Sequence, residues 1–191
     1  MRRVCTQSLT AFAASRFQHG APAAVGGKKV DLFGYEVDTN TAPWIEKIKA
    51  CKVYDEAGEV LVDMNVKNCP PDIATYNATL QKIFEAGSKQ TTPVDNESKF
   101  CAMMDLLEEM SHRNHVKPNE ESWTWVMREA VQSKNFRIGY VIQRVMEKEC
   151  KSCPADLVAG NDANAAKAKA DGNEHPGFLS KQIGLFDHVI A

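Results

Sequence analysis

The sequence lacks any long hydrophobic run, and no stretch of it approaches the ~18 apolar residues that span a bilayer, so we expect no membrane-spanning segment. It also lacks a Ser-His-Asp nucleophile elbow, a phosphate-binding loop, a glycine-rich dinucleotide turn and a His-Glu-x-x-His motif. We therefore expect no enzyme activity and no cofactor. The formal net charge is −2, which excludes the broad basic field typical of nucleic-acid-binding proteins.

Acidic residues are missing from the N-terminus, where "MRRVCTQSLTAFAASRFQHG" combines arginines with serines and threonines and the first acidic residue of the chain is Asp31. This composition is typical of a mitochondrial transit peptide. We predict a transit peptide over residues 1–17, and hence an acidic mature protein in the mitochondrial matrix. Gly, Pro and Ala then dominate the start of an arm that we place at residues 18–40.

The six cysteines are scattered, and most fall within apolar helical patterns. They resemble reduced, buried thiols more than a disulfide framework. Cys150 and Cys153, in "CKSC", have the spacing of a metal or redox pair, but a zinc site needs a second pair of ligands. We therefore expect structural or free thiols here and no metal site.

Helical periodicity dominates the chain from Thr41 onward. One set of apolar residues falls at helical offsets 0, 3, 4, 7 and 8, and a second set repeats the same five offsets: Tyr76, Thr79, Leu80, Ile83 and Phe84, then Trp123, Val126, Met127, Ala130 and Val131. Asp72 and Asn119 stand at equivalent places before these segments, each after a proline, and are predicted to cap the two helices.

Each of these helices is followed by a second apolar periodicity, and a weaker copy of the pair lies upstream. The second helices carry Phe100, Met103, Met104, Leu107 and Met110 in one copy, and Phe136, Gly139, Tyr140 and Met146 in the other. Upstream, Thr41 can cap a helix with Trp44, Ile48 and Cys51, before a helix with Ala57, Val60, Leu61 and Met64. Because one hairpin cannot bury its own apolar face, the hairpins must stack. We predict an all-α stack over residues 41–156, with a tail over 157–191.

The segments "PDIATYNATLQKIFEAG", "LLEEM" and "VKPNEESWTWVMREAVQSKNF" resemble pentatricopeptide repeats. The resemblance implies about three degenerate repeats between extended N- and C-terminal arms. It also implies candidate RNA-reading positions, Asn77 with Asn119 and Thr124 with Asp156, because members of this family read one base per repeat. Two good copies would read only two bases, and the acidic mature chain would neutralise few phosphates. We therefore treat RNA binding as the alternative function and a protein-binding role as the preferred one.

A closer resemblance covers nearly the whole chain. The segment "GKKVDLFGYEVDTNTAPWIEKIKA", the hairpins and the tail "HPGFLSKQIGLFD" are similar to a euglenozoan family of small accessory subunits of the mitochondrial ATP synthase catalytic head. This resemblance implies a non-catalytic structural subunit, on the matrix side of the inner membrane, that docks on the outside of the α subunits, one copy per α subunit. The alternative is an RNA-binding pentatricopeptide protein or a mitochondrial ribosome subunit.

The two arms contain the apolar residues that we select as candidate partner anchors, because aromatic residues often dominate interface energies. The anchors are Leu32, Phe33, Tyr35, Phe178, Leu185 and Phe186.

Overall fold

The computed structural model describes residues 23–25, 28–30, 34–86 and 96–172 of the chain. The predicted transit peptide, much of the N-terminal arm and the end of the C-terminal tail lie outside the described residues. The described elements are strands β1 (Ala23–Val25) and β2 (Lys28–Val30), the π-helix η2 (Glu109–Arg113), and helices α1 (Ala42–Ala50), α2 (Tyr54–Val66), α3 (Ile73–Ala86), α4 (Asn96–Glu108), α5 (Glu120–Gln132), α6 (Phe136–Glu149) and α7 (Ala155–Ala170).

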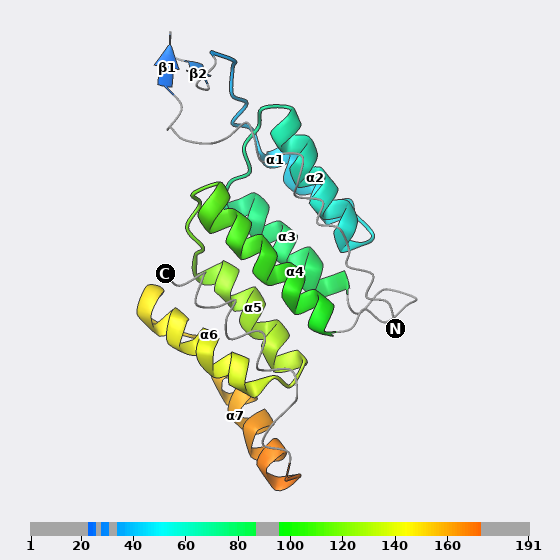
Figure 1. Ribbon diagram of the computed structural model, residues 1–191, viewed down its shortest axis with the longest axis vertical. Coiled ribbons are helices and arrows are strands. Elements are labelled where there is room, and N and C mark those ends of the chain that lie inside the picture. The colour runs from blue at the N-terminus through cyan, green and yellow to red at the C-terminus, as the bar shows by residue number, and fades with distance from the viewer. Residues whose placement is uncertain (1–22, 26–27, 31–33, 87–95, 173–191) are drawn as a thin grey trace.

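The helices form two layers of an elongated stack (Figure 1). We call α1, α3, α5 and α7 the A helices, because each packs on the next in that order. We call α2, α4 and α6 the B helices, and each packs on its own A helix and on the following one. The prediction of an all-α stack of helical hairpins is confirmed for this body.

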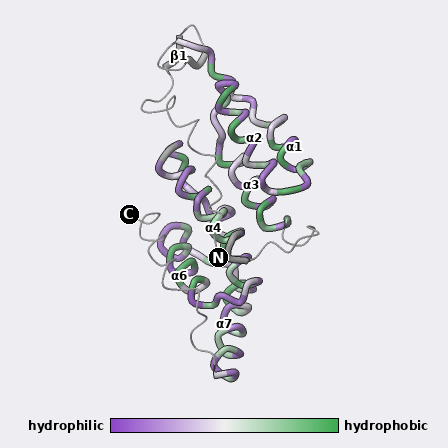
Figure 2. The backbone as a smooth tube through the Cα atoms, turned by 45° about the vertical axis from the view of Figure 1, so that its right-hand side comes forward, coloured by the Kyte–Doolittle hydropathy of each residue, from purple (hydrophilic) through white to green (hydrophobic). Residues whose placement is uncertain are grey.

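The apolar faces predicted from periodicity point into the stack, and Figure 2 shows hydrophobic and hydrophilic residues alternating along the helices. Tyr76 and Leu80 of α3 are fully buried, as are Val126 and Met127 of α5. The methionines near the ends of the B helices are fully buried as well: Met64, Met110 and Met146. A single cluster of buried side chains runs from α1 to α7, so the core is continuous between repeats.

Two predicted details of the stack are wrong. Tyr140 was expected on the buried face of α6, but it is 37% exposed, and Ile138 and Ile142 are buried instead. Thr41 was expected to cap α1 with its side chain, but its hydroxyl donates to the Asp72 carboxylate at 2.8 Å. The arm also contains an element that was not predicted, the antiparallel pair of β1 with β2, in which Ala23 lies opposite Val30.

Helices α2 and α5 each end in a left-handed residue other than glycine, and His115 and Lys151 adopt the same conformation elsewhere in the described turns. Asn68 has a φ of 57°, the Cys69 amide donates to the Met64 carbonyl at 2.9 Å, and the Asn68 amide donates to the Asn65 carbonyl at 3.1 Å. Lys134, with a φ of 58°, ends α5 with the same pair of bonds. This is the Schellman pattern of helix termination, and it aims the chain into the next helix.

Helix α7 joins the stack through the buried side chain of Leu157 and through polar contacts. Its residue Asn161 is fully buried, and the side-chain amide donates to the Phe136 carbonyl at 3.0 Å. The Asn164 amide donates to the Val131 carbonyl at 2.8 Å. A Cβ atom at Gly139 would overlap the Asn161 side chain, so the glycine permits the close approach of α6 and α7. The predicted end of the repeat region at residue 156 falls inside α7.

A buried ion pair joins α4 to α5. Lys99 Nζ lies 2.8 Å from Glu129 Oε2, and the two side chains are 1% and 0% exposed. The Lys99 ammonium also lies 5.4 Å from the centre of the Phe84 ring on α3. Burial raises the pKa of the Glu129 carboxyl, and Lys99 acts in the opposite direction. Removing either charge would leave the other buried without its partner.

We expect Gly139→Ala to release α7 from the stack, because the added methyl group displaces the buried Asn161 side chain from its bond to Phe136. The free energy of unfolding should fall by about 1–3 kcal/mol, and amide hydrogen exchange should accelerate within α7. The matched control is Gly58→Ala in α2, where a Cβ atom meets nothing within 4 Å. This control should stabilise the protein by about 0.5–1 kcal/mol. Unchanged exchange in α7 would contradict the close-approach argument.

For the buried pair, we expect Lys99→Met to lower the free energy of unfolding by about 3–5 kcal/mol, because Glu129 is left buried and uncompensated. Adding Glu129→Leu should recover most of that loss. Chemical denaturation of the two variants measures the difference. The control is Lys49→Met, which breaks a pair with Glu46 whose side chains are 58% and 74% exposed, and it should cost less than about 1 kcal/mol. Equal losses in the single and double variants would refute the coupling.

Candidate functional site: the starts of the A helices

The starts of consecutive A helices are tied to each other by polar side chains. Asp72, just before α3, accepts hydrogen bonds from the Thr75 amide at 2.8 Å and from the Thr75 hydroxyl at 2.6 Å. It also accepts the hydroxyl of Thr41, at the start of α1. Burial opposes ionisation of the Asp72 carboxyl, but these hydrogen bonds together lower its pKa below the usual value. The predicted cap is therefore present, and it also links the first repeat to the second.

The structure brings together two of the candidate RNA-reading positions, Asn77 and Asn119. Asn77 is 4% exposed. Its side-chain amide donates to Asn119 Oδ1 at 3.2 Å and to Glu121 Oε2 at 2.8 Å. Its carbonyl oxygen accepts the Ser122 hydroxyl at 2.6 Å. Asn119 also caps α5 by accepting the Ser122 amide at 3.0 Å. These two asparagines therefore hold α3 against the start of α5.

The other candidate pair is arranged differently. The Thr124 hydroxyl donates to the Glu120 carbonyl one turn earlier in α5, at 2.7 Å. Asp156 is exposed in the first turn of α7, where its charge suits the positive end of the helix dipole. Both side chains thus have roles within their own helices.

Of the candidate partner anchors, Tyr35 alone lies within the described residues, and its side chain is 69% exposed. Leu32, Phe33, Phe178, Leu185 and Phe186 lie outside them. The segment beside Tyr35 is fixed to the turn between α2 and α3, because the Asn68 amide donates to the Glu36 carbonyl at 2.7 Å and the Asp38 amide donates to the Asn68 carbonyl at 3.1 Å. The role of Asn68 was not predicted from the sequence, although asparagine is a residue type that tolerates the left-handed conformation.

The two cysteines of "CKSC" lie between α6 and α7. Burial raises the pKa of the Cys150 thiol, and the carboxylates of Glu120 and Glu149 add to that effect. Burial also raises the pKa of the Cys153 thiol, together with Glu147 and Asp156. Both thiols therefore stay protonated near neutral pH. Because metal binding and nucleophilic attack need thiolates, these cysteines are poorly suited to either chemistry. Within the described residues, no three His, Cys, Asp or Glu side chains lie close enough together to hold a metal ion.

This geometry defines a class of protein, a helical-repeat scaffold in which polar contacts connect one repeat to the next. Among the described residues, no helix combines the length and the apolar character needed to cross a bilayer.

Comparison with known proteins gives the family. Residues 34–169 match the family described as the ATP synthase subunit p18 TPR-like domain, a description that agrees with stacked helix–turn–helix repeats. The chain is also 72% identical over 187 residues to "ATP synthase subunit p18, mitochondrial" of Trypanosoma brucei brucei, which covers 98% of this chain and 97% of that relative. The chain belongs to the ATP synthase subunit p18 family, and the family assignment made from the sequence is confirmed.

We expect Asp72→Ala to destabilise the protein in a pH-dependent way. The folded-state pKa of Asp72 is lowered, so its stabilisation is complete above the unfolded-state pKa of about 3.9 and is lost as the pH falls through the folded-state value. The variant should lose about 1–2 kcal/mol of unfolding free energy at pH 7, and the loss should shrink in acid. Urea denaturation at several pH values measures it.

The control for this test is Asn119→Ala, which removes the equivalent but uncharged cap from α5. Its loss of unfolding free energy should stay constant over the same pH range. A loss for Asp72→Ala that is equally constant would show that the charge of Asp72 contributes nothing.

Proposed function

We propose that this chain is a non-catalytic structural subunit of the mitochondrial ATP synthase, and that it docks on the outside of the α subunits of the catalytic head. The observation that carries the first part is the 72% identity, over nearly the full length of both chains, to a relative named as a mitochondrial ATP synthase subunit. The docking position and a ratio of one copy per α subunit rest on the resemblance of the sequence to accessory subunits of that head.

The mechanism that we propose for this subunit is burial of surface area. A standard protein interface buries about 1,600 Å² in total, and a stack with a continuous core offers a rigid body for it. Tyr35 supports the proposal, because it is a large aromatic side chain held out to solvent on a segment whose backbone is pinned to Asn68. A pre-positioned aromatic loses little conformational freedom on binding.

The arrangement of Asn77 favours a scaffold over an RNA reader. A base edge would have to replace the bonds from Asn77 to Asn119, Glu121 and Ser122, and the 4% exposure of Asn77 leaves little access. The alternative is an RNA-binding pentatricopeptide protein or a mitochondrial ribosome subunit. A purification with and without ribonuclease distinguishes this alternative from the proposal.

The location that we propose is the mitochondrial matrix, beside the inner membrane. The relative is named as mitochondrial, and the composition of residues 1–17 predicts import. A subunit bound to the catalytic head of the enzyme would lie on the matrix side.

We expect a tagged copy of the full chain, purified from mitochondrial lysate, to retain the α and β subunits of ATP synthase after ribonuclease treatment. Mass spectrometry with label-free quantification measures this retention. Recovery of ribosomal proteins or transcripts that disappear with ribonuclease would overturn the proposal. It would make Asn77, Asn119, Thr124 and Asp156 the residues to mutate next.

Within the same experiment, Tyr35→Ala should reduce recovery of the α subunit several-fold, because exposed aromatic anchors carry a large share of interface energy. Tyr35→Phe is the matched control, since it keeps the ring and should recover the α subunit as the wild type does. The thermal midpoint of both variants should match that of the wild type, because Tyr35 lies on the surface. Equal recovery with Tyr35→Ala would remove Tyr35 from the anchors.

A further inference from the structure

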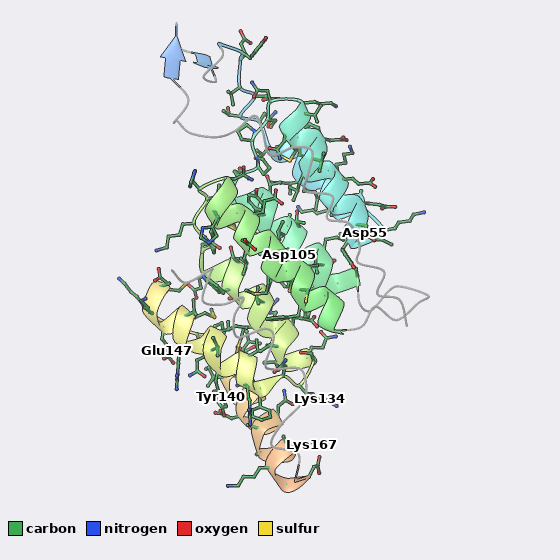
Figure 3. The ribbon with its side chains drawn as sticks, viewed as in Figure 1. Asp55, Asp105, Lys134, Tyr140, Glu147 and Lys167 are labelled. Carbon is green, nitrogen blue, oxygen red and sulfur yellow. The ribbon has the colours of Figure 1, made fainter. Side chains whose placement is uncertain are left out.

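The outward faces of the B helices differ in charge, because α2 and α4 are acidic whereas α6 carries cations. Within α2, every side chain that is charged at neutral pH is acidic: Asp55, Glu56, Glu59 and Asp63. On α4, Asp105 and Glu108 are exposed. On α6, a row that we call the α6 stripe combines the exposed side chains of Tyr140, Arg144 and Lys148 with the half-buried side chains of Arg137 and Val141. Figure 3 shows Asp55 on α2, Asp105 on α4, and Tyr140 and Glu147 on α6. The layer of B helices is therefore acidic at α2 and α4 and cationic along the α6 stripe, with the exposed carboxylates of Glu147 and Glu149 beside that stripe.

The α6 stripe occupies one face of its helix because its residues recur at intervals of three and four. Ile138, Ile142 and Met146 lie on the opposite face and are buried in the core. From Arg137 to Lys148 the stripe extends roughly 16 Å, at 1.5 Å per residue. Tyr140 is held within it by a hydrogen bond from its hydroxyl to Asp162 at 2.9 Å. The stripe thus combines cations with a fixed aromatic ring.

The carboxylates nearest to the stripe make their closest contacts with other residues, and Lys148 adds a weaker attraction to Glu149. Glu149 pairs with Lys117 at 2.6 Å, and Glu147 accepts the side-chain amide of Gln143 at 2.8 Å. Arg144 and Lys148 form no ion pair with any residue that the structure describes. Two cations on the exposed face of α6 are therefore available to an external anion, although the chain as a whole is acidic.

We infer that the α6 stripe is a docking surface for an acidic protein surface on another subunit of the ATP synthase, an inference that rests on the proposed function. Arginine and tyrosine are enriched at protein interfaces, where they combine charge with contact area. Carboxylates on the partner complement Arg144 and Lys148, and the exposed ring of Tyr140 adds apolar contact beside them. A partner helix with acidic residues spaced three or four apart matches the length of the stripe.

Nucleic acid fits the same surface less well. A phosphate backbone that continued beyond the stripe would meet the acidic faces of α4 and α2, which repel it. A compact acidic patch on a protein avoids those faces. The same repulsion sets the orientation of the partner, because a partner turned end for end would bring its carboxylates against α2.

The test compares charge reversals on the two ends of the B-helix layer in the tagged full chain. Arg144→Glu with Lys148→Glu reverses the stripe, and Asp55→Lys with Glu59→Lys reverses α2 as the matched control. Circular dichroism and thermal midpoints establish that both variants are folded, since all four side chains are exposed. We expect the stripe reversal to lower recovery of ATP synthase subunits by about tenfold or more, and the α2 reversal to leave it within about twofold.

The salt dependence gives a second readout. A milder variant, Arg144→Ala with Lys148→Ala, should elute from the complex at lower salt than the wild-type chain, because fewer charge pairs form. Wild-type-like recovery of the stripe reversal, or equal losses in both reversals, would overturn the inference while leaving the proposed function intact. Failure of the wild-type chain to recover ATP synthase would overturn the proposed function itself. Recovery that depends on the stripe and disappears with ribonuclease would assign the stripe to RNA.

Discussion

The apolar face of one helical hairpin is too large for the hairpin to bury alone, and this constraint organises the whole molecule. Each B helix lies in the groove between its own A helix and the next, so every repeat completes its core with a neighbour. Stability in such a stack is approximately a sum of repeat terms and nearest-neighbour interface terms. The interfaces between repeats therefore matter as much as the hairpins, and the polar contacts at these interfaces acquire structural importance.

Hydrophobic burial brings the repeats together, but it does not fix how far one helix slides along another. Directional contacts supply that precision. The hydrogen bond from Thr41 to Asp72, the one from Asn77 to Asn119 and the one from Ser122 to Asn77 align successive A helices at their starts. The buried pair of Lys99 with Glu129 aligns α4 with α5. Because an unpaired buried polar group is costly, a shift of one helix by a turn would break several of these contacts together.

The sequence predicted the elements with strong periodicity and missed those held by polar contacts. The apolar rows of α3, α4 and α5 and the caps at Asp72 and Asn119 follow local rules that one chain segment displays by itself. The face assigned to Tyr140 was wrong because Ile138, Ile142 and Val145 lie at the centre of the buried face of α6. Tyr140 lies beyond the edge of that face, with its hydroxyl bonded to Asp162 of α7. The place of α7 could not be read from its own residues, because asparagines rather than an apolar row attach it.

The contacts of the candidate site were less predictable from the sequence than the helices were. Its residues could be selected by family position, but the burial of Asn77 arises from a partner more than 40 residues away, which local patterns do not reveal. The exposure of Tyr35 agrees with its selection as an anchor. The charge polarity of the B helices is visible in the sequence only after the structure shows which side of each helix faces solvent.

The left-handed helix ends have an electrostatic consequence. A left-handed residue other than glycine costs roughly 1–2 kcal/mol, and the described turns place Lys134 and Lys151 in that conformation. Each lysine follows the C-terminus of a helix, α5 or α6, where the aligned peptide dipoles carry partial negative charge. The attraction between the ammonium group and the helix end offsets part of the conformational cost. The chain reversals after α5 and α6 therefore depend more on ionic strength than the turn at Asn68, whose left-handed residue carries no charge.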